Sequence, residues 1–166
     1  LDPKANLLHN FVNDLKNLKD FKPIEYKEYN HDTGKFNNPI SVEPKSFIVL
    51  SGLHTFYLPK IRKITDIKIY LIPDENLRKY WKIQRDVKQR GYSENEVLKA
   101  MKKREKDAQK YILPQKNFAD LIISYFMPQN KSENKTELNL KIEIDSSIYL
   151  DDLIDFLSKQ EIDFVW

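Results

Sequence analysis

The 166-residue sequence contains no cysteine and only three glycines, Gly34, Gly52 and Gly91. Without cysteine the chain can form neither a disulfide framework nor a thiolate nucleophile. Its glycines are too far apart to spell GxxxxGK[ST], the loop whose backbone N–H groups cradle nucleotide phosphates. The sequence therefore excludes thiol chemistry, and it contains no phosphate-binding loop of that type.

Long apolar runs, paired metal ligands and a strong charge of one sign are missing as well. No apolar stretch of about 18 residues could span a bilayer, and the first residues do not resemble a signal peptide. His9, His31 and His54 lack the HExxH spacing of a zinc site, so we expect no metal centre. The net charge of +3 favours neither a nucleic-acid nor a membrane partner. We expect a cytoplasmic, globular protein.

Apolar periodicity divides the chain into helices and strands. Leucines at helical spacing behind Asp2 and Pro3 predict a capped helix over residues 4–19. Two prolines and a DTG turn predict a loose hairpin over 21–44. Short apolar runs predict three buried strands, in SFIVLSGLH (46–54), DIKIYLI (66–72) and ADLIISYF (119–126).

Two charged helices are predicted between the second and third of these strands. The first runs over 74–90, with an acidic start and a basic end, and Trp81 is expected to anchor it to the core. Gly91 ends this helix. The capping-box pattern SENE then opens a second helix that reaches about Lys103.

Strands that alternate with helices predict the α/β class with a parallel or mixed sheet, because crossovers between parallel strands carry helices over the sheet faces. Ligands of such sheets bind at the carboxyl ends of strands, which draws attention to the loop that begins at Ser51 and includes His54. Residues 129–166 are expected to form a polar linker, a half-buried strand and an amphipathic helix.

The segment WKIQRDVKQRG sets four charged side chains on adjoining turns of the first charged helix: Lys82, Arg85, Asp86 and Arg90. Their spacing places much of this charge along one helical face. Such a face can bind phosphate, because guanidinium groups offer a planar fork to its oxygens and lysine offers a point charge. A solvated helix with internal ion pairs would show the same pattern, so the spacing alone leaves both interpretations open.

Five words of the sequence, in order, resemble the phosphoribulokinase and uridine kinase family: LDPKAN, YNHDTG, SGLH, WKIQRDVKQRGYS and PQKNFADLII. The similarity covers residues 1–128 and is nearest to the phosphoribulokinase branch. It implies a P-loop-kinase fold, which is a three-layer parallel or mixed sheet with helices on both faces. Residues 1–128 would bind the phosphoryl acceptor and provide a lid, residues 82–104, that closes over the transferring phosphoryl group.

The resemblance also implies roles for the charged residues of the lid. Lys82, Arg85 and Arg90 would neutralise charge that develops on the phosphoryl group, or hold a sugar phosphate. Asp86 would orient these cations, and Arg104 could join them. Phosphoryl transfer depends mainly on positioning and electrostatic stabilisation, so fixed cations inside a closing lid suit this chemistry.

Three further residues match acceptor-binding words of the family. Tyr29 and His31, in YNHDTG, would hydrogen-bond hydroxyl groups of a sugar, although a tyrosine and a histidine in a polar turn would give the same pattern. His54, in SGLH, lies past a predicted strand end, where a substrate can reach it. The alternative for His54 is a purely structural loop histidine.

Two departures from the family limit what these residues would do alone. Ser51 stands where many members carry a glutamate that helps to organise magnesium. The phosphate loop and the Asp general base expected upstream of LDPKAN are also absent, so ATP and Mg would be bound largely by residues outside this sequence. We therefore expect the acceptor and lid half of a kinase for a sugar phosphate, such as ribulose 5-phosphate, or a nucleoside. We expect the 166 residues alone to be inactive.

Two alternatives remain open at this point. Ser51 and the missing nucleotide site also fit a degenerate kinase that serves as a binding or assembly module. An apolar sheet edge, left open where a strand and a helix would belong, would favour a homo-oligomer. The acceptor's identity and the role of residues 138–166 do not follow from the sequence.

Overall fold

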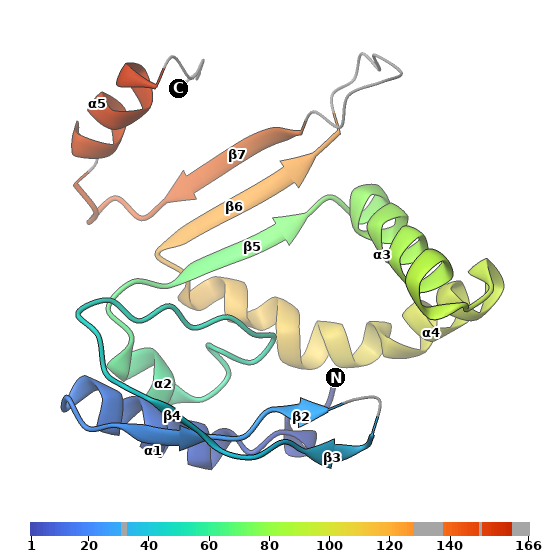
Figure 1. The fold of residues 1–166 in the computed structure, drawn as a ribbon. Coiled ribbons are helices and arrows are strands. Elements are labelled where there is room, and N and C mark those ends of the chain that lie inside the picture. The colour runs from blue at the N-terminus through green and yellow to red at the C-terminus, as the bar shows by residue number, and fades with distance from the viewer. Residues whose placement is uncertain (31–32, 128–137, 150, 161–166) are drawn as a thin grey trace.

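The computed structural model describes residues 1–30, 33–127, 138–149 and 151–160. Its largest sheet has three strands in the order β5 (Ile69–Pro73), β6 (Leu121–Phe126) and β7 (Asn139–Ile144). β5 and β6 are parallel, whereas β7 pairs with β6 in the antiparallel sense (Figure 1). The predicted α/β class with a mixed sheet is therefore confirmed.

The crossover from β5 to β6 is helical, as parallel neighbours require. It contains α3 (Glu75–Arg90), α4 (Glu94–Asp107), a π-helical turn η2 (Ala108–Ile112) and a 3-10 turn η3 (Leu113–Phe118). Figure 1 shows α3 beyond the carboxyl end of β5, and the arm from α4 to η3 returning beneath the sheet. The crossover thus carries the cationic helix to the end of the sheet where ligands of α/β proteins bind.

The joint between α3 and α4 follows from local sequence. Gly91 ends α3 in the left-handed region, at φ 71°, which glycine adopts without a Cβ clash. Ser93 then opens α4 with the predicted capping box, in which it exchanges hydrogen bonds with Glu96. The two helices are therefore separated by a defined turn.

Helical structure continues further along the chain than predicted. α4 ends at Asp107 rather than near Lys103, and η2 and η3 extend the helical arm to Phe118. The segment REKDAQK contains residues of high helix propensity and neither glycine nor proline, so its polarity does not interrupt the helix. The next proline, Pro114, lies in the first turn of η3, where its missing N–H is tolerated.

The amino-terminal helix begins later than predicted. α1 spans Leu8–Lys19 and is preceded by a separate 3-10 turn, η1 (Pro3–Ala5). Asp2 caps η1, not α1, because Asn6 is extended, at φ −120° and ψ 144°, and separates the two helical segments. The helical spacing of the leucines is unaffected by this break, which is why it did not show in the sequence pattern.

The main core cluster lies between α1 and α2 (Pro59–Ile64). Val12 and Leu15 from α1 are buried against Ile61 from α2, and partly buried apolar side chains surround them. This packing fixes the loop that precedes α2, which carries His54.

Residues 21–44 form the predicted hairpin in two parts. β1 (Ile24–Tyr26) pairs with β4 (Ile40–Val42), and β2 (Tyr29–Asn30) pairs with β3 (Lys35–Phe36); both pairs are antiparallel. Gly34 turns the chain before β3 at φ 67°.

The predicted strand at the start of SFIVLSGLH is wrong. Residues 46–50 have no regular secondary structure, and Phe47 and Val49 are each 91% exposed. A strand needs a neighbour for its backbone groups, and no strand in the described part of the chain pairs with this segment. The apolar pattern is present, but none of the described strands lies beside it as a partner.

The carboxyl-terminal residues extend the sheet. β7 lies along the whole of β6, and α5 (Asp151–Lys159) follows it. The predicted polar linker, residues 129–137, lies outside the described residues. Across the described ranges, we find no helix with the length and apolar character needed to span a membrane.

Candidate active site

The second half of α3 gathers three cationic side chains around one carboxylate. Asp86 is only 5% exposed. Its Oδ2 atom accepts a hydrogen bond from Lys82 Nζ at 2.6 Å, and its Oδ1 atom accepts from Arg85 Nε at 2.9 Å and from Arg90 Nη1 at 3.3 Å. The structure therefore brings together the four residues predicted from WKIQRDVKQRG. We refer to them as the Asp86 cluster.

Helical spacing explains this arrangement. Lys82 and Arg90 lie four residues before and after Asp86, so both reach it along one face of α3, and Arg85 is its neighbour in the chain. The hydrogen bond from Lys82, followed in importance by that from Arg85, lowers the pKa of Asp86 from 3.8 to about 2. The carboxylate therefore stays ionised at physiological pH and holds the cations in fixed directions.

The Asp86 cluster keeps an excess of positive charge, because three cations share a single carboxylate. The side chains of Arg85 and Arg90 are 48% and 55% exposed, so a ligand can reach them from solvent. Each guanidinium also retains N–H donors that Asp86 does not use. A second anion with several oxygen atoms, such as a phosphate, suits these free donors.

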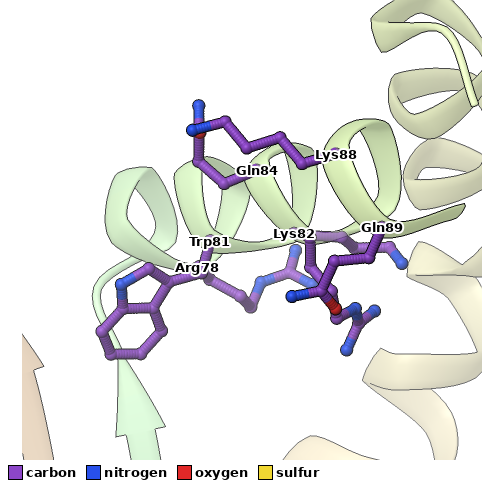
Figure 2. A pocket seen from close by; sticks show the side chains of 7 residues that line it. Arg78, Trp81, Lys82, Gln84, Lys88 and Gln89 are labelled. Atoms are coloured by element: carbon purple, nitrogen blue, oxygen red, sulfur yellow. The ribbon is translucent and has the colours of Figure 1, made fainter. Parts of the chain in front are cut away.

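A shallow hollow of about 580 Å³ runs along the same helix. It is lined by the cations Arg78, Lys82, Arg85 and Lys88 and by Trp81, Gln84 and Gln89. Figure 2 shows these side chains projecting from α3, with the indole of Trp81 at the helix end nearest the strand. Of the described residues that line the hollow, none is acidic, so this surface attracts anions.

The sequence predicted that Trp81 anchors α3 in the core, and this prediction is wrong. Trp81 is 38% exposed, and its ring lies 6.4 Å from the ring of Tyr125. Leu77, one turn earlier, is the fully buried anchor. Helical periodicity places both residues on one side of α3, but it does not determine which of them faces the sheet.

Two other predicted residues lie apart from the Asp86 cluster. Arg104 is exposed near the end of α4 and is not among the partners of Asp86. Tyr29 lies on β2, in edge-on contact with Phe36, and lines neither this hollow nor the one beside His54. His31 lies outside the described residues.

His54 lines a second hollow, of about 400 Å³, together with Asp2, Asn6, Ser51 and Thr55. The histidine is 8% exposed, and its Nδ1 atom is buried without a hydrogen-bond partner among the described residues. Burial lowers the pKa of His54 below its usual 6.5, so the ring is neutral at neutral pH. The hydroxyl, amide and imidazole groups around this hollow suit the hydroxyl groups of a ligand.

Two residues that hold the loop of His54 were missed in the sequence. Gln115 is buried in η3 and hydrogen-bonds to Leu53 and Phe56. Arg62 donates from α2 to the backbone of the same loop. A glutamine in a polar segment is typically exposed, so no sequence signal marks Gln115 apart from its place in the word PQKNFADLII.

The described residues contain no group of three His, Cys, Asp or Glu side chains that could hold a metal ion. Ser51 offers only a hydroxyl where the resemblance implies a glutamate. The residues present therefore fit the phosphate groups of a nucleotide, through the Asp86 cluster, and offer no clustered ligands for the metal.

Comparison with known proteins agrees with these features. A sequence model of the Phosphoribulokinase / Uridine kinase family matches residues 1–133. Phosphoribulokinase from Synechocystis sp. is 35% identical over 144 residues, which cover 87% of this chain and 43% of that protein. Chloroplastic phosphoribulokinase from Spinacia oleracea is 37% identical over 123 residues, 74% of this chain and 31% of that protein. Uridine kinase from Ligilactobacillus salivarius is 33% identical over 133 residues, 79% of this chain and 60% of that protein.

The match includes both parts of the candidate site, because the Asp86 cluster and the His54 hollow lie within residues 1–133. The chain spans less than half the length of the two phosphoribulokinases and 60% of the uridine kinase. By this match, the chain belongs to the phosphoribulokinase and uridine kinase family.

Proposed function

We propose that this chain forms the acceptor and lid half of an ATP-dependent kinase, which transfers a phosphoryl group to a hydroxyl of a sugar phosphate or nucleoside. The Asp86 cluster carries the proposal, because it presents three oriented cations around one buried carboxylate. The names of the relatives, phosphoribulokinase and uridine kinase, support the same class of reaction.

The Asp86 cluster stabilises the phosphoryl group during transfer. Negative charge in the transition state spreads over three equatorial oxygens, so catalysis is largely positioning and electrostatic stabilisation. Arg85 and Arg90 donate to these oxygens, and Lys82 adds a point charge. Asp86 keeps the donors oriented before the reaction, so they need not reorganise at the moment of transfer. Arg104 joins them when the lid, residues 82–104, closes.

The acceptor lies in the hollow beside His54. A neutral imidazole can both donate and accept a hydrogen bond, which matches a sugar hydroxyl. The resemblance also assigns acceptor hydroxyl groups to Tyr29 and His31, although Tyr29 does not line this hollow and His31 lies outside the described residues. Ribulose 5-phosphate is the favoured acceptor, because the words of the sequence are nearest to the phosphoribulokinase branch. A cytoplasmic location is also part of this proposal.

ATP, magnesium and the general base belong to a nucleotide-binding half outside these 166 residues. The described residues contain no group of three metal-ligating side chains, and the sequence holds no GxxxxGK[ST] loop. When bound there, ATP supplies the phosphoryl group. The 166-residue chain alone is therefore inactive as a kinase, and ATP-dependent phosphorylation by the purified chain would overturn this division. A gene that encodes no glycine-rich phosphate loop upstream of Leu1 would overturn it too.

Replacement of Arg85 or Arg90 by Ala in the full-length protein tests the lid role. Loss of one preorganised donor to a transferring group costs about 3 kcal/mol, or ~100-fold in turnover. Loss of an exposed ion pair costs at most about 1 kcal/mol of folding stability. Steady-state kinetics and thermal melting should therefore show slow but stable variants.

Lys79 provides a matched control, because it is an exposed cation of α3 that lines neither hollow. Lys79→Ala should change neither turnover nor melting temperature. If the Arg85 and Arg90 variants kept full turnover and only melted earlier, the cluster would be a solvated structural face.

A degenerate kinase that serves as a binding or assembly module is the second candidate. It is favoured by Ser51 and by the lack of a metal-ligand group among the described residues. Calorimetric titration of the full-length protein with acceptor and with MgATP separates the two candidates. Acceptor binding without any phosphoryl transfer would support the module.

A further inference from the structure

Gln115 has the lowest exposure, 4%, of the buried polar residues that the structure describes. Its Oε1 atom accepts a hydrogen bond from the backbone N–H of Phe56 at 2.9 Å. Its Nε2 atom donates to the carbonyl oxygens of Leu53, at 2.8 Å, and Tyr111, at 2.7 Å. The amide thus uses both of its donors and one acceptor site, in one buried and two partly buried hydrogen bonds.

Two of these bonds lie on either side of His54. Leu53 precedes the histidine directly, and Phe56 follows it by two residues. The ring of Tyr57 contacts the imidazole edge-on, with 5.9 Å between centroids, and contacts the ring of Tyr111 in the same way. The backbone that carries His54 is therefore fixed from the helical arm between α4 and β6.

Arg62 holds the later part of the same loop. Its Nη1 atom donates to the carbonyl oxygens of Phe56, at 2.7 Å, and Tyr57, at 3.1 Å. Its guanidinium also stacks 3.8 Å from the ring centroid of Phe118, at the end of η3. Both of these carbonyls follow His54, and within the loop Thr55 Oγ1 donates to the carbonyl oxygen of Gly52 at 2.6 Å. Gln115 is the described side chain from outside the loop that bonds it on both sides of the imidazole.

Glutamine suits this position because its planar amide offers donors and an acceptor together. A buried carbonyl or N–H that loses its partner is unfavourable unless it moves to water. A loop without Gln115 would therefore relax towards solvent and take His54 with it.

We propose that Gln115 is a positioning residue for the acceptor site, whose amide holds the backbone on both sides of His54 and keeps the imidazole on the wall of the second hollow. Gln115 does not itself line that hollow. The acceptor role of His54 rests on the proposed function, whereas the fixation of its loop does not. Gln115 lies in η3, which follows α4 and η2 in the chain. Its hydrogen bonds therefore connect the loop of His54 to the helical segment that follows the lid.

Gln115→Leu in the full-length protein tests this role, because leucine has a similar size and removes all three hydrogen bonds. By NMR, the Phe56 amide should exchange with deuterium about tenfold faster. The His54 imidazole signals should shift, and the His54 pKa should move up towards its usual value. The KM for the acceptor should rise, while the KM for ATP stays unchanged. Gln109→Leu, at an exposed glutamine of η2, is the matched control and should change none of these.

Gln115→Glu keeps the test decisive if the leucine variant fails to fold. Burial against two carbonyl oxygens keeps this carboxyl group protonated, so it retains the acceptor for Phe56 and one O–H donor but loses the second donor shared between Leu53 and Tyr111. The Phe56 amide should then stay protected while the His54 signals still shift. Unchanged His54 signals in a folded variant would overturn the proposal, as would equally accelerated exchange throughout the protein. Shifted His54 signals with an unchanged acceptor KM would uphold the positioning and refute the acceptor contact of His54 instead.

Discussion

Among the residues that the structure describes, Asp86 pairs with three cations. Asp86→Asn leaves Lys82, Arg85 and Arg90 facing one another without their shared carboxylate. We expect urea unfolding at neutral pH to show a loss of about 1–3 kcal/mol, because a charged hydrogen-bond acceptor is removed. Glu75→Gln is the control, since its pair with Arg78 is exposed and contributes at most about 1 kcal/mol. Equal losses in the two variants would contradict a special role for Asp86.

The pH dependence of stability gives an independent measure of the same residue. The pKa of Asp86 is about 2 in the folded protein and 3.8 as its reference value, so its contribution is complete above the reference value. It is lost as the pH falls from 3.8 towards 2. Over this window the wild type should lose at most about 2 kcal/mol more than Asp86→Asn. Solvent screening reduces the value, because Arg85 and Arg90 are half exposed.

The residues that the sequence identified are those whose partners are local. Asp86 meets cations within four residues on its own helix, so their spacing predicts the contact. Gln115 meets Phe56 and Leu53 across 59 and 62 residues, and no spacing rule covers such a contact. The prediction for Trp81 was wrong for a related reason. Helical periodicity shows which residues share a face of the helix, but not which of them packs against the sheet.

At the level of elements, the turn between α3 and α4 is fixed by the conformation of Gly91. Gly91→Ala should lower stability by about 1–2 kcal/mol, because an L residue at this positive φ brings its Cβ close to the next carbonyl. Beyond Gly91 itself and its two chain neighbours, no atom lies within 4 Å of the added Cβ, so the cost comes from the local backbone conformation and not from tertiary contacts.

Gly52→Ala is the control for that measurement. Its added Cβ also meets open space, but the residue does not adopt a positive φ. Denaturant unfolding should therefore separate the two variants. If Gly91→Ala unfolded at the same midpoint as the wild type, the turn would not hold the left-handed conformation in solution.

Strands were predicted correctly where an apolar run of the sequence also has a neighbouring strand with which to pair. β5 and β6 form where the apolar runs lie, because each finds a neighbour in the sheet. Residues 46–50 carry the same kind of pattern and stay irregular, since strand formation depends on a second segment that the pattern does not specify. The length of α4 was underestimated, because its last residues are polar, although most of them have high helix propensity.

For the molecule as a whole, the outer edge of β5 carries an unpaired row of backbone groups in the described chain. Ile69 and Leu71 of β5 are exposed, as is Ile67 just before the strand. We expect the isolated chain to self-associate through this apolar edge. Sedimentation velocity over a range of concentrations should show a sedimentation coefficient that rises with concentration.

Ile69→Lys should suppress this association, because a charged side chain on an edge strand opposes edge-to-edge pairing. Leu7→Lys, at an exposed apolar residue away from the sheet, should leave it unchanged. A wild-type chain that sediments as a monomer at high concentration would show that the edge is protected in another way.

The class of the fold and the family follow from the sequence, because strand and helix signals alternate and the family words lie in order. The arrangement of the sheet does not follow so directly. The alternating pattern over Asn139–Ile144 indicates a half-buried strand, but it gives neither the neighbour of that strand nor its direction, so the antiparallel pairing of β7 with β6 was not predicted.

The π-helical turn η2 determines the direction in which the side chains of η3 point around the axis of the helical arm from α4 to η3. Side chains on a regular helix advance by about 100° per residue, and a π turn accommodates one residue more than an α turn. Gln115 lies in η3, three residues after Ile112 at the end of this turn, so the direction of its amide depends on the number of residues in Ala108–Ile112. Deletion of a single residue there would rotate the amide away from Leu53 and Phe56, although every residue that touches the loop would still be present.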